Sequence, residues 1–314
     1  MKLFVCIYSY RDLELDKTIK DLYAKADNPK DIFCGVLNAD DVPYKSKRKN
    51  VRIKNVDYTQ YHGCGRACYE IFTELYQGED YIVKIDPHTR FEKGWDTYYK
   101  QFIGEDKVIC SRCLGYYEDG TKDPLKNTYS VPVDWQNGFV TKIDERPLTE
   151  FPKETLFMQA GFFMAPASWV EKVNYDPYIA MWGEESDLSM RTILAGYKIF
   201  AVPAHVYHLY GRKNRKSVDN STEFNILNAQ GVRRTQIKIG ILPADDNVMQ
   251  EWDKYSCDGK KWRDAVEKMF APDWKFIDPK TVVVCKHCGS KTFYGFGQCK
   301  WCYKDLKGSK VVKQ

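Results

Sequence analysis

Two short motifs carry side chains that could together bind a divalent cation. Asp86 and His88 directly follow the apolar run of residues 80–86. At the end of an extended strand, side chains two positions apart can point the same way. His208 ends a second β-forming run, and we expect it to supply a third ligand. Carboxylate and imidazole groups suit Mn²⁺ or Mg²⁺, and such a cation can neutralise a departing diphosphate; ordinary loops are the alternative interpretation.

Further polar groups lie between and after these motifs, and they could take part in proton transfer or bind phosphate. Glu184 and Glu185 lie in the first turn of a predicted helix over residues 182–197. Adjacent carboxylates at a helix start can hold acceptor hydroxyls or act as a general base, and helix capping is the alternative. Two basic residues, Arg212 and Lys213, follow the last histidine at a distance suited to phosphate contacts.

A separate module at the C-terminal end has the spacing of a zinc site. It consists of two C-x2-C pairs separated by ten residues, formed by Cys285, Cys288, Cys299 and Cys302. Four thiolates at this spacing close a tetrahedral Zn²⁺ site, which predicts a small structural zinc ribbon. A further C-x2-C pair, Cys110 and Cys113, has no partner pair, and we interpret it as two buried or unpaired thiols.

The positive charge of the chain is concentrated around this module. The net charge is +5, yet residues 285–314 hold seven lysines and one aspartate, which leaves the rest of the chain slightly acidic. Lysines interleaved with aromatic residues favour a nucleic-acid contact by the ribbon. A protein-docking knob or a stability cap is the alternative.

The elements that must position these groups alternate between strand and helix. Apolar runs predict strands over residues 3–8, 31–41, 50–58 and 80–86, and helical spacing predicts helices over 12–26 and 65–78. This order indicates an α/β fold with a mostly parallel sheet, in which ligands lie beyond the carboxyl ends of the strands. The residues that follow the first strand, and so fall at such an end, are Ser9, Tyr10, Arg11 and Asp12.

The second half of the chain is less regular. We predict loops with short strands over residues 105–155, a buried strand over 157–166 and a last strand over 198–211. Residues 217–270 are predicted to be mostly helical.

Composition excludes several classes of protein. The 314 residues are 43% hydrophobic and 29% charged, which is typical of a globular chain and not of a disordered or coiled-coil one. No run of about 18 apolar residues occurs, so we expect no membrane span. The first residues predict a strand rather than a signal peptide, and the cysteine usage favours a reducing, cytoplasmic compartment.

Taken together, residues 1–215 resemble a known family. The segments that carry the resemblance are, in order, SYRDLELDKTIKDLYAKADNP, GCGRACYEIFTELYQGEDYIVKIDPHTRFEKGWD, WGEESDLSMRTILAGY and HVYHLYGR. They resemble the cytosolic-type hydroxyproline polypeptide α-GlcNAc-transferases and, more distantly, the polypeptide GalNAc-transferases. The resemblance implies a GT-A fold, with a mostly parallel mixed sheet flanked by helices. It also implies a divalent metal, a UDP-sugar donor and retention of anomeric configuration.

The same resemblance implies roles for particular residues. The metal and diphosphate site corresponds to Asp86, His88 and His208. The positions that contact the nucleotide correspond to Ser9, Arg11, Asp12 and Arg66. The positions near the reacting sugar and the acceptor correspond to Glu184 and Glu185. The helix that carries them also matches a pattern of inverting sugar transferases, in which Glu185 is the catalytic base.

These features divide the chain and define its expected reaction. We expect a glycosyltransferase core over residues 1–215, a helical extension and linker over 216–280, a zinc ribbon over 281–305 and a basic tail over 306–314. The reaction moves a sugar from a UDP-sugar to a hydroxyl on a macromolecule, either a protein hydroxyl such as hydroxyproline or a hydroxymethylated base in DNA. A catalytically inactive adaptor that docks partners through its zinc ribbon is the alternative.

Overall fold

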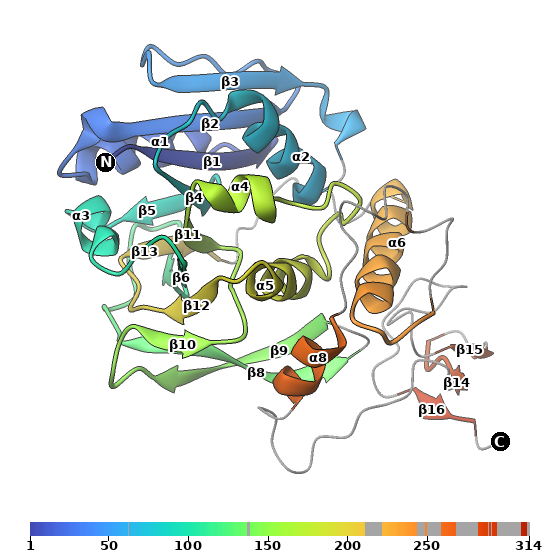
Figure 1. Ribbon diagram of the computed structural model, residues 1–314. Coiled ribbons are helices and arrows are strands. Elements are labelled where there is room, and N and C mark those ends of the chain that lie inside the picture. Colours follow the sequence, from blue (N-terminus) through green and yellow to red (C-terminus); the bar gives the residue numbers. More distant parts are fainter. Residues whose placement is uncertain are drawn as a thin grey trace.

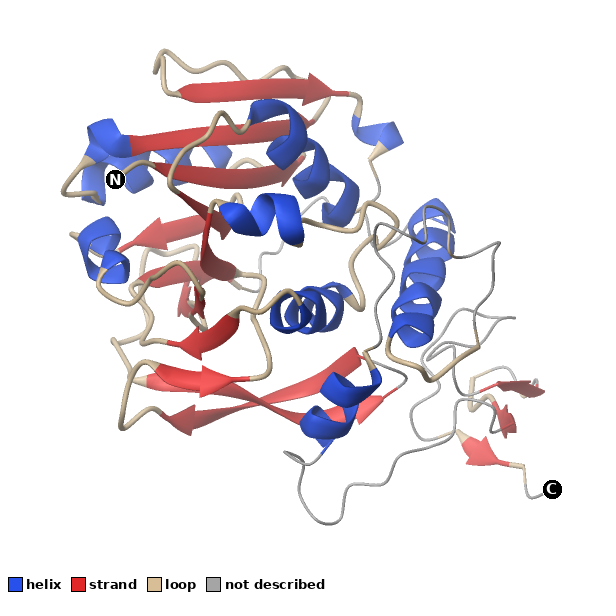
Figure 2. Ribbon diagram, in the orientation of Figure 1, coloured by secondary structure: helices blue, strands red, loops and turns tan. Residues whose placement is uncertain are grey.

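A computed structural model describes residues 1–61, 63–136, 139–210, 222–243, 259–267, 282–287, 291–293 and 309–312, together with residues 249 and 289. Strands and helices alternate through the first part of the chain, and the strands gather into one large sheet with helices against it (Figures 1 and 2). The expected α/β architecture is therefore confirmed.

The large sheet is mixed. Its strands are, in spatial order, β10 (Lys153–Thr155), β12 (Lys198–Ala201), β6 (Lys107–Cys110), β11 (Phe162–Pro166), β4 (Tyr81–Ile85), β1 (Leu3–Tyr10), β2 (Ile32–Ala39) and β3 (Val51–Val56). Four of the seven pairings are parallel, and the two pairings of β11 and that of β10 with β12 are antiparallel. Because β1 and β4 are parallel neighbours, their carboxyl ends meet at one edge of the sheet.

Alternation along β1 explains why helices cover both faces of the sheet. Its odd-numbered residues pack with α1 (Leu15–Lys25) and α3 (Trp95–Lys100) in one buried cluster. Its even-numbered residues pack with the other helices in a second cluster, namely α2 (Cys64–Glu70), α4 (Ser168–Lys172) and α5 (Glu184–Leu194). Such burial on both faces requires the near-continuous apolar runs seen in these strands.

The predicted helices and strands keep their places with altered ends. The helix expected over residues 65–78 divides into α2 and a π-helical turn, η3 (Ile71–Leu75). The strand expected over residues 157–166 begins only at β11. Two 3₁₀ turns, η1 (Pro29–Asp31) and η2 (Tyr58–Gln60), precede β2 and α2.

The expectation of one last strand over residues 198–211 is wrong. The run forms two strands in different sheets: β12 ends at Ala201, and β13 (Val206–Leu209) begins after Pro203. Since proline lacks an N–H for ladder pairing, it separates the two. β13 lies between β5 (Thr89–Phe91) and β7 (Leu114–Tyr116) in a three-stranded sheet.

The interpretation of residues 105–155 as loops with short strands is also incomplete. β6 and β7 are short, but β8 (Thr128–Gln136) and β9 (Phe139–Pro147) each span nine residues and pair as a separate antiparallel ribbon. The ladder shifts register twice, between Pro132 and Trp135. Such irregularity obscures the period-two pattern by which a strand is recognised in sequence.

Helix α6 (Thr222–Lys238) is joined to α5 through buried ion pairs. Lys238 lies 2.6 Å from carboxylate oxygens of both Asp176 and Asp187. Arg234 also pairs with Asp176, and Arg191 with Asp187. All five side chains are nearly or fully buried. Buried charges require such partners, so this network specifies how α6 seats against the first turns of α5.

Near the C-terminal end, the structure describes helix α8 (Lys260–Glu267) and strands β14 (Val282–Val284), β15 (Lys291–Phe293) and β16 (Lys310–Val311), with β14 in the middle of their sheet. Cys285 is buried. The other three predicted zinc ligands, Cys288, Cys299 and Cys302, lie outside the described residues, so the zinc ribbon stays a prediction. The interpretation of Cys110 and Cys113 is confirmed, since both are buried free thiols.

The buried network predicts a large stability cost for losing one carboxylate. Asp176→Asn would leave Arg234 and Lys238 sharing too little negative charge, and we expect a loss of about 3–5 kcal/mol in the free energy of unfolding. Urea denaturation followed by circular dichroism measures this loss. The control is Asp264→Asn in the exposed pair with Lys260, where we expect no measurable loss of stability because solvent screens the pair. Equal losses in both variants would contradict the structural role of the network.

Candidate active site

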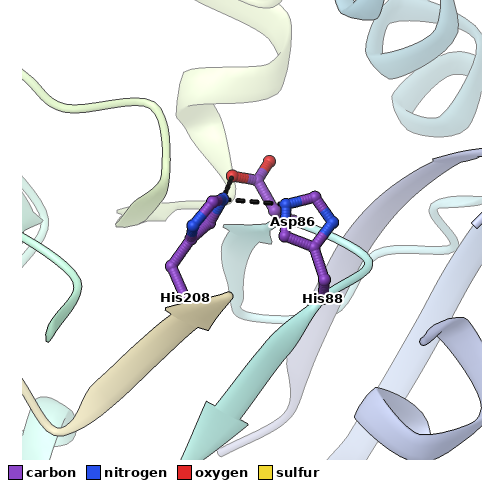
Figure 3. A group of neighbouring side chains, drawn as sticks. All are labelled: Asp86, His88 and His208. Atoms are coloured by element: carbon purple, nitrogen blue, oxygen red, sulfur yellow. Dashed lines mark hydrogen bonds and ion pairs between the residues drawn. The ribbon is translucent and has the colours of Figure 1, made fainter. Parts of the chain in front are cut away.

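Three segments that are distant in the sequence meet at the carboxyl edge of the large sheet. Asp86 follows β4, His88 precedes β5, and His208 lies in β13. Figure 3 shows the three side chains pointing toward one another from these strands. The third segment follows β1 and carries Asp12. The three residues predicted to hold the cation are therefore brought together.

The ligand atoms of the cluster lie close to one another. Nε2 of His88 is 2.8 Å from Nε2 of His208, and the latter is 3.3 Å from Oδ2 of Asp86. All three candidate ligand atoms lie within 4.8 Å of one another. The side chains of Asp86 and His208 remain 27% and 15% exposed, so solvent and ions can reach the cluster.

Two further side chains orient these candidate ligands. Oδ2 of Asp12 lies 2.8 Å from Nδ1 of His88 and directs Nε2 of that ring into the cluster. Lys84 donates to Oδ1 of Asp86 at 2.7 Å, which leaves Oδ2 to face His208. Both partners are almost completely buried.

The electrostatics keep the cluster in a state suited to a cation. Burial lowers the pKa of His88 and favours the neutral imidazole that binds metals. Burial raises the pKa of Asp86, but the Lys84 ammonium and the two histidines more than offset it, so the pKa lies well below its usual range. Ionised carboxylate and neutral imidazole match Mn²⁺ or Mg²⁺ in chemistry. The residues present therefore fit a divalent cation.

Glu184 and Glu185 stand in the first turn of α5, beside this cluster. Glu184 is buried and accepts a hydrogen bond from the thiol of Cys64, and burial raises its pKa. Glu185 accepts from the backbone N–H of Ala160 at 2.9 Å, and burial raises its pKa to about 7. A carboxyl that titrates near neutrality can exchange a proton with a bound hydroxyl.

The residues expected to contact the nucleotide adopt an unusual local geometry. The backbone of Arg11 has φ 47°, in the left-handed region that residues other than glycine rarely adopt. Its guanidinium pairs with Asp41 at 2.7 Å and lies over the ring of Tyr58. Ser9 is fully buried at the end of β1. The structure thus gathers charged and aromatic groups where β1, β2 and β3 end.

The chain matches the profile of a protein family described as Glycosyltransferase (GlcNAc), over residues 2–42 and 38–277. It belongs to this family. The chain is accordingly a glycosyltransferase, and the family assignment made from the sequence is confirmed at this level.

Two solved structures with bound nucleotide sugars are similar to this glycosyltransferase. TarS 1-349 from S. aureus in complex with UDP-GlcNAc is 14% identical, with 81% of this chain and 72% of that chain covered and a TM-score of 0.47. The mannosyltransferase PcManGT from Pyrobaculum calidifontis in complex with GDP-Man and Mn²⁺ is 9% identical, with 85% and 73% covered and a TM-score of 0.46. No curated protein sequence matches the chain. Within the described residues, no helix of the glycosyltransferase is long and apolar enough to cross a membrane.

The remaining predicted nucleotide-contact residues are Arg66 and Arg212. Arg66 extends from α2, pairs with Glu70 at 2.9 Å and lies over the ring of Tyr61. Arg212 lies outside the described residues of the glycosyltransferase. Of the two histidines in residues 205–208, His208 belongs to the cluster. The ring of His205 instead stacks on the ring of Tyr98, with the ring centroids 3.5 Å apart.

Sequence reasoning missed two residues of the glycosyltransferase site. One is Cys64, whose hydrogen bond to Glu184 spans 120 positions and left no pattern in the sequence. The other is Lys84, and here a signal existed. A lysine inside an otherwise apolar buried strand, two positions before an aspartate, lies on the same face of the strand as that aspartate.

The pH dependence of stability tests the environment of Glu185. The pKa of its carboxyl is about 4.3 in an unfolded chain, and burial raises this pKa to about 7 in the folded protein. Between these values the folded state holds a proton that the unfolded chain releases, so wild-type stability falls as pH rises. Relative to wild type, Glu185→Gln should therefore gain about 1–3 kcal/mol of unfolding free energy between about pH 5 and pH 8.

Urea denaturation in EDTA at both pH values measures this difference. The matched control is Glu118→Gln, at an exposed position. A stability difference between Glu185→Gln and wild type that is the same at both pH values would show that this carboxyl is not held in a proton-retaining environment.

Proposed function

We propose that this glycosyltransferase moves a sugar from a UDP-sugar to a hydroxyl on a macromolecular acceptor, with a divalent cation and with retention of configuration. The observation that carries the proposal is the cluster of Asp86, His88 and His208, with Asp12 behind His88. A bound Mn²⁺ or Mg²⁺ would offset the charge that develops on the departing diphosphate.

The residues of the chain itself have distinct roles in this proposal. Asp86, His88 and His208 hold the cation, and Asp12 keeps the His88 ring in the orientation that presents Nε2. The groups at the ends of β1 and β2, including Ser9 and Arg11, bind the nucleotide, with Arg66 and Arg212 as further proposed contacts. A positively charged surrounding stabilises a diphosphate leaving group.

Glu184 and Glu185 act on the acceptor side. Their place in the first turn of α5 and beside the cluster supports contact with the reacting sugar and the incoming hydroxyl. If Glu185 instead removed the acceptor proton for direct attack from the opposite side, configuration at C1 would invert. The resemblance of residues 1–215 supports retention.

Two acceptors fit the proposal, a protein hydroxyl such as hydroxyproline and a hydroxymethylated base in DNA. The family resemblance supports the first. The lysines of residues 285–314, the predicted four-Cys zinc ribbon and the basic stretch of residues 44–52 support the second. A flipped base could reach the site while basic side chains contact the DNA backbone.

The metal cluster is tested by removing one ligand at a time. His88→Ala and His208→Ala should each reduce sugar transfer and UDP-sugar hydrolysis by at least about 100-fold, because each variant lacks one side chain that would hold the cation. EDTA should have the same effect on the wild type, and Mn²⁺ should restore activity. Release of UDP is the measurement.

The matched control is His205→Gln, three positions from His208 and outside the cluster. It should retain wild-type activity. Full activity of His88→Ala in the presence of EDTA would refute the proposed reaction. Folded protein that neither binds nor hydrolyses any UDP-sugar would favour the inactive adaptor.

The acceptor and the stereochemistry are tested in one experiment. Radiolabelled UDP-sugar is offered with hydroxymethyl-base duplex DNA or with a cell lysate, and the labelled polymer is identified. We expect label in one of the two, and NMR of the product gives the anomeric configuration. A product with inverted configuration would contradict retention. It would support direct displacement at C1, with Glu185 as the base.

A further inference from the structure

A buried lysine shares a carboxylate with the proposed metal site. Lys84 lies next to the carboxyl end of β4, which has β1 and β11 as neighbours on either side, and its side chain is 6% exposed. Its ammonium lies 2.7 Å from Oδ1 of Asp86. The other oxygen of the same carboxylate faces His208. A cation in the cluster and the ammonium would thus be bound to the two sides of one carboxylate.

The side chains that hold or orient the candidate ligands do not balance a divalent cation in charge. Glu184 also interacts with the Lys84 ammonium, but burial raises its pKa and favours the uncharged carboxyl. Asp86 and Asp12 contribute two negative charges, the imidazoles of His88 and His208 are neutral when they bind a metal, and Lys84 contributes one positive charge. These five side chains therefore carry a net charge of −1 around an ion of charge +2. Without the lysine they would carry −2 and balance the ion.

We propose that Lys84 makes binding of the cation depend on the diphosphate of the donor. The inference rests on the proposed function, because it takes the cluster as the metal site. The lysine weakens binding of the cation to the protein alone, and the negative charge that the lysine cancels is supplied by the diphosphate when the nucleotide binds. Cation and nucleotide then enter as a pair, and each raises the affinity of the other by the same factor.

This arrangement has a physical reason in the geometry. Like charges on either side of one carboxylate repel, and at short range this repulsion changes an equilibrium at least about tenfold even where solvent screens it. Lys84 cannot turn away to relieve the repulsion, since it is buried in the sheet. It is a positioning and charge-setting residue rather than a catalytic one.

The first test uses the unaltered protein. Binding of Mn²⁺ is measured by electron paramagnetic resonance, with and without UDP. We expect UDP to tighten Mn²⁺ binding at least about tenfold. Equal Mn²⁺ affinity in both conditions would overturn the inference. This test needs no variant, so it does not depend on whether a variant folds.

The second test removes the charge and keeps a hydrogen-bond donor. Lys84→Gln should bind Mn²⁺ at least about tenfold more tightly than wild type in the absence of UDP, and the gain from UDP should shrink correspondingly. Lys84→Arg, which keeps the charge, should retain the weak binding. Melting temperatures identify the variants that are folded.

Lys198→Gln is the matched control, because it makes the same change in net charge at an exposed position of β12. It should leave Mn²⁺ affinity unchanged. Unchanged or weaker Mn²⁺ binding by folded Lys84→Gln would overturn the inference. Failure of the proposed function looks different, since wild type would then bind no Mn²⁺ even with UDP present.

Discussion

The need to pair buried charge at one edge of the sheet governs this structure. β1 and β4 are parallel neighbours, so the polar residues that follow them are forced together at their carboxyl ends. The Lys84–Asp86 ion pair lies at this point. Because an unpaired charge in such a place is costly, each group must have a partner, and the partners hold the ligand atoms of Asp86 and His88 in position.

The same requirement extends to the helices that cover the sheet. α5 carries Glu184 and Glu185 toward the cluster, and Asp187 in the same first turn forms a buried ion pair with Lys238 of α6. The side chain of Asn228 in α6 also accepts a hydrogen bond from the backbone N–H of Trp182 at 2.8 Å. Trp182 lies in the turn that leads into α5. A helix beyond the resembling region thereby helps to hold the segment that bears the two carboxylates.

Much of the fold could be predicted because β1, β2 and β4 are buried on both faces and read as continuous apolar runs. Other elements could not. The run at residues 198–211 has the composition of one strand, but Pro203 divides it between two sheets. The long ribbon of β8 and β9 was missed because its register shifts break the alternation.

By itself, the sequence determined the types and local spacing of the ligands: Asp86 and His88 at the end of a buried run, and His208 in a second one. The resemblance of the surrounding segments pointed to GlcNAc-transferases, and the matching profile shows the glycosyltransferase (GlcNAc) family; the hydroxyproline-specific group stays a prediction. Only the tertiary structure decided that these side chains share one site, that Lys84 and Asp12 are their partners, and that Cys64 is the partner of Glu184. The physical reason is that pairing between residues as many as 120 positions apart depends on how strands and helices pack, and local spacing carries no record of it.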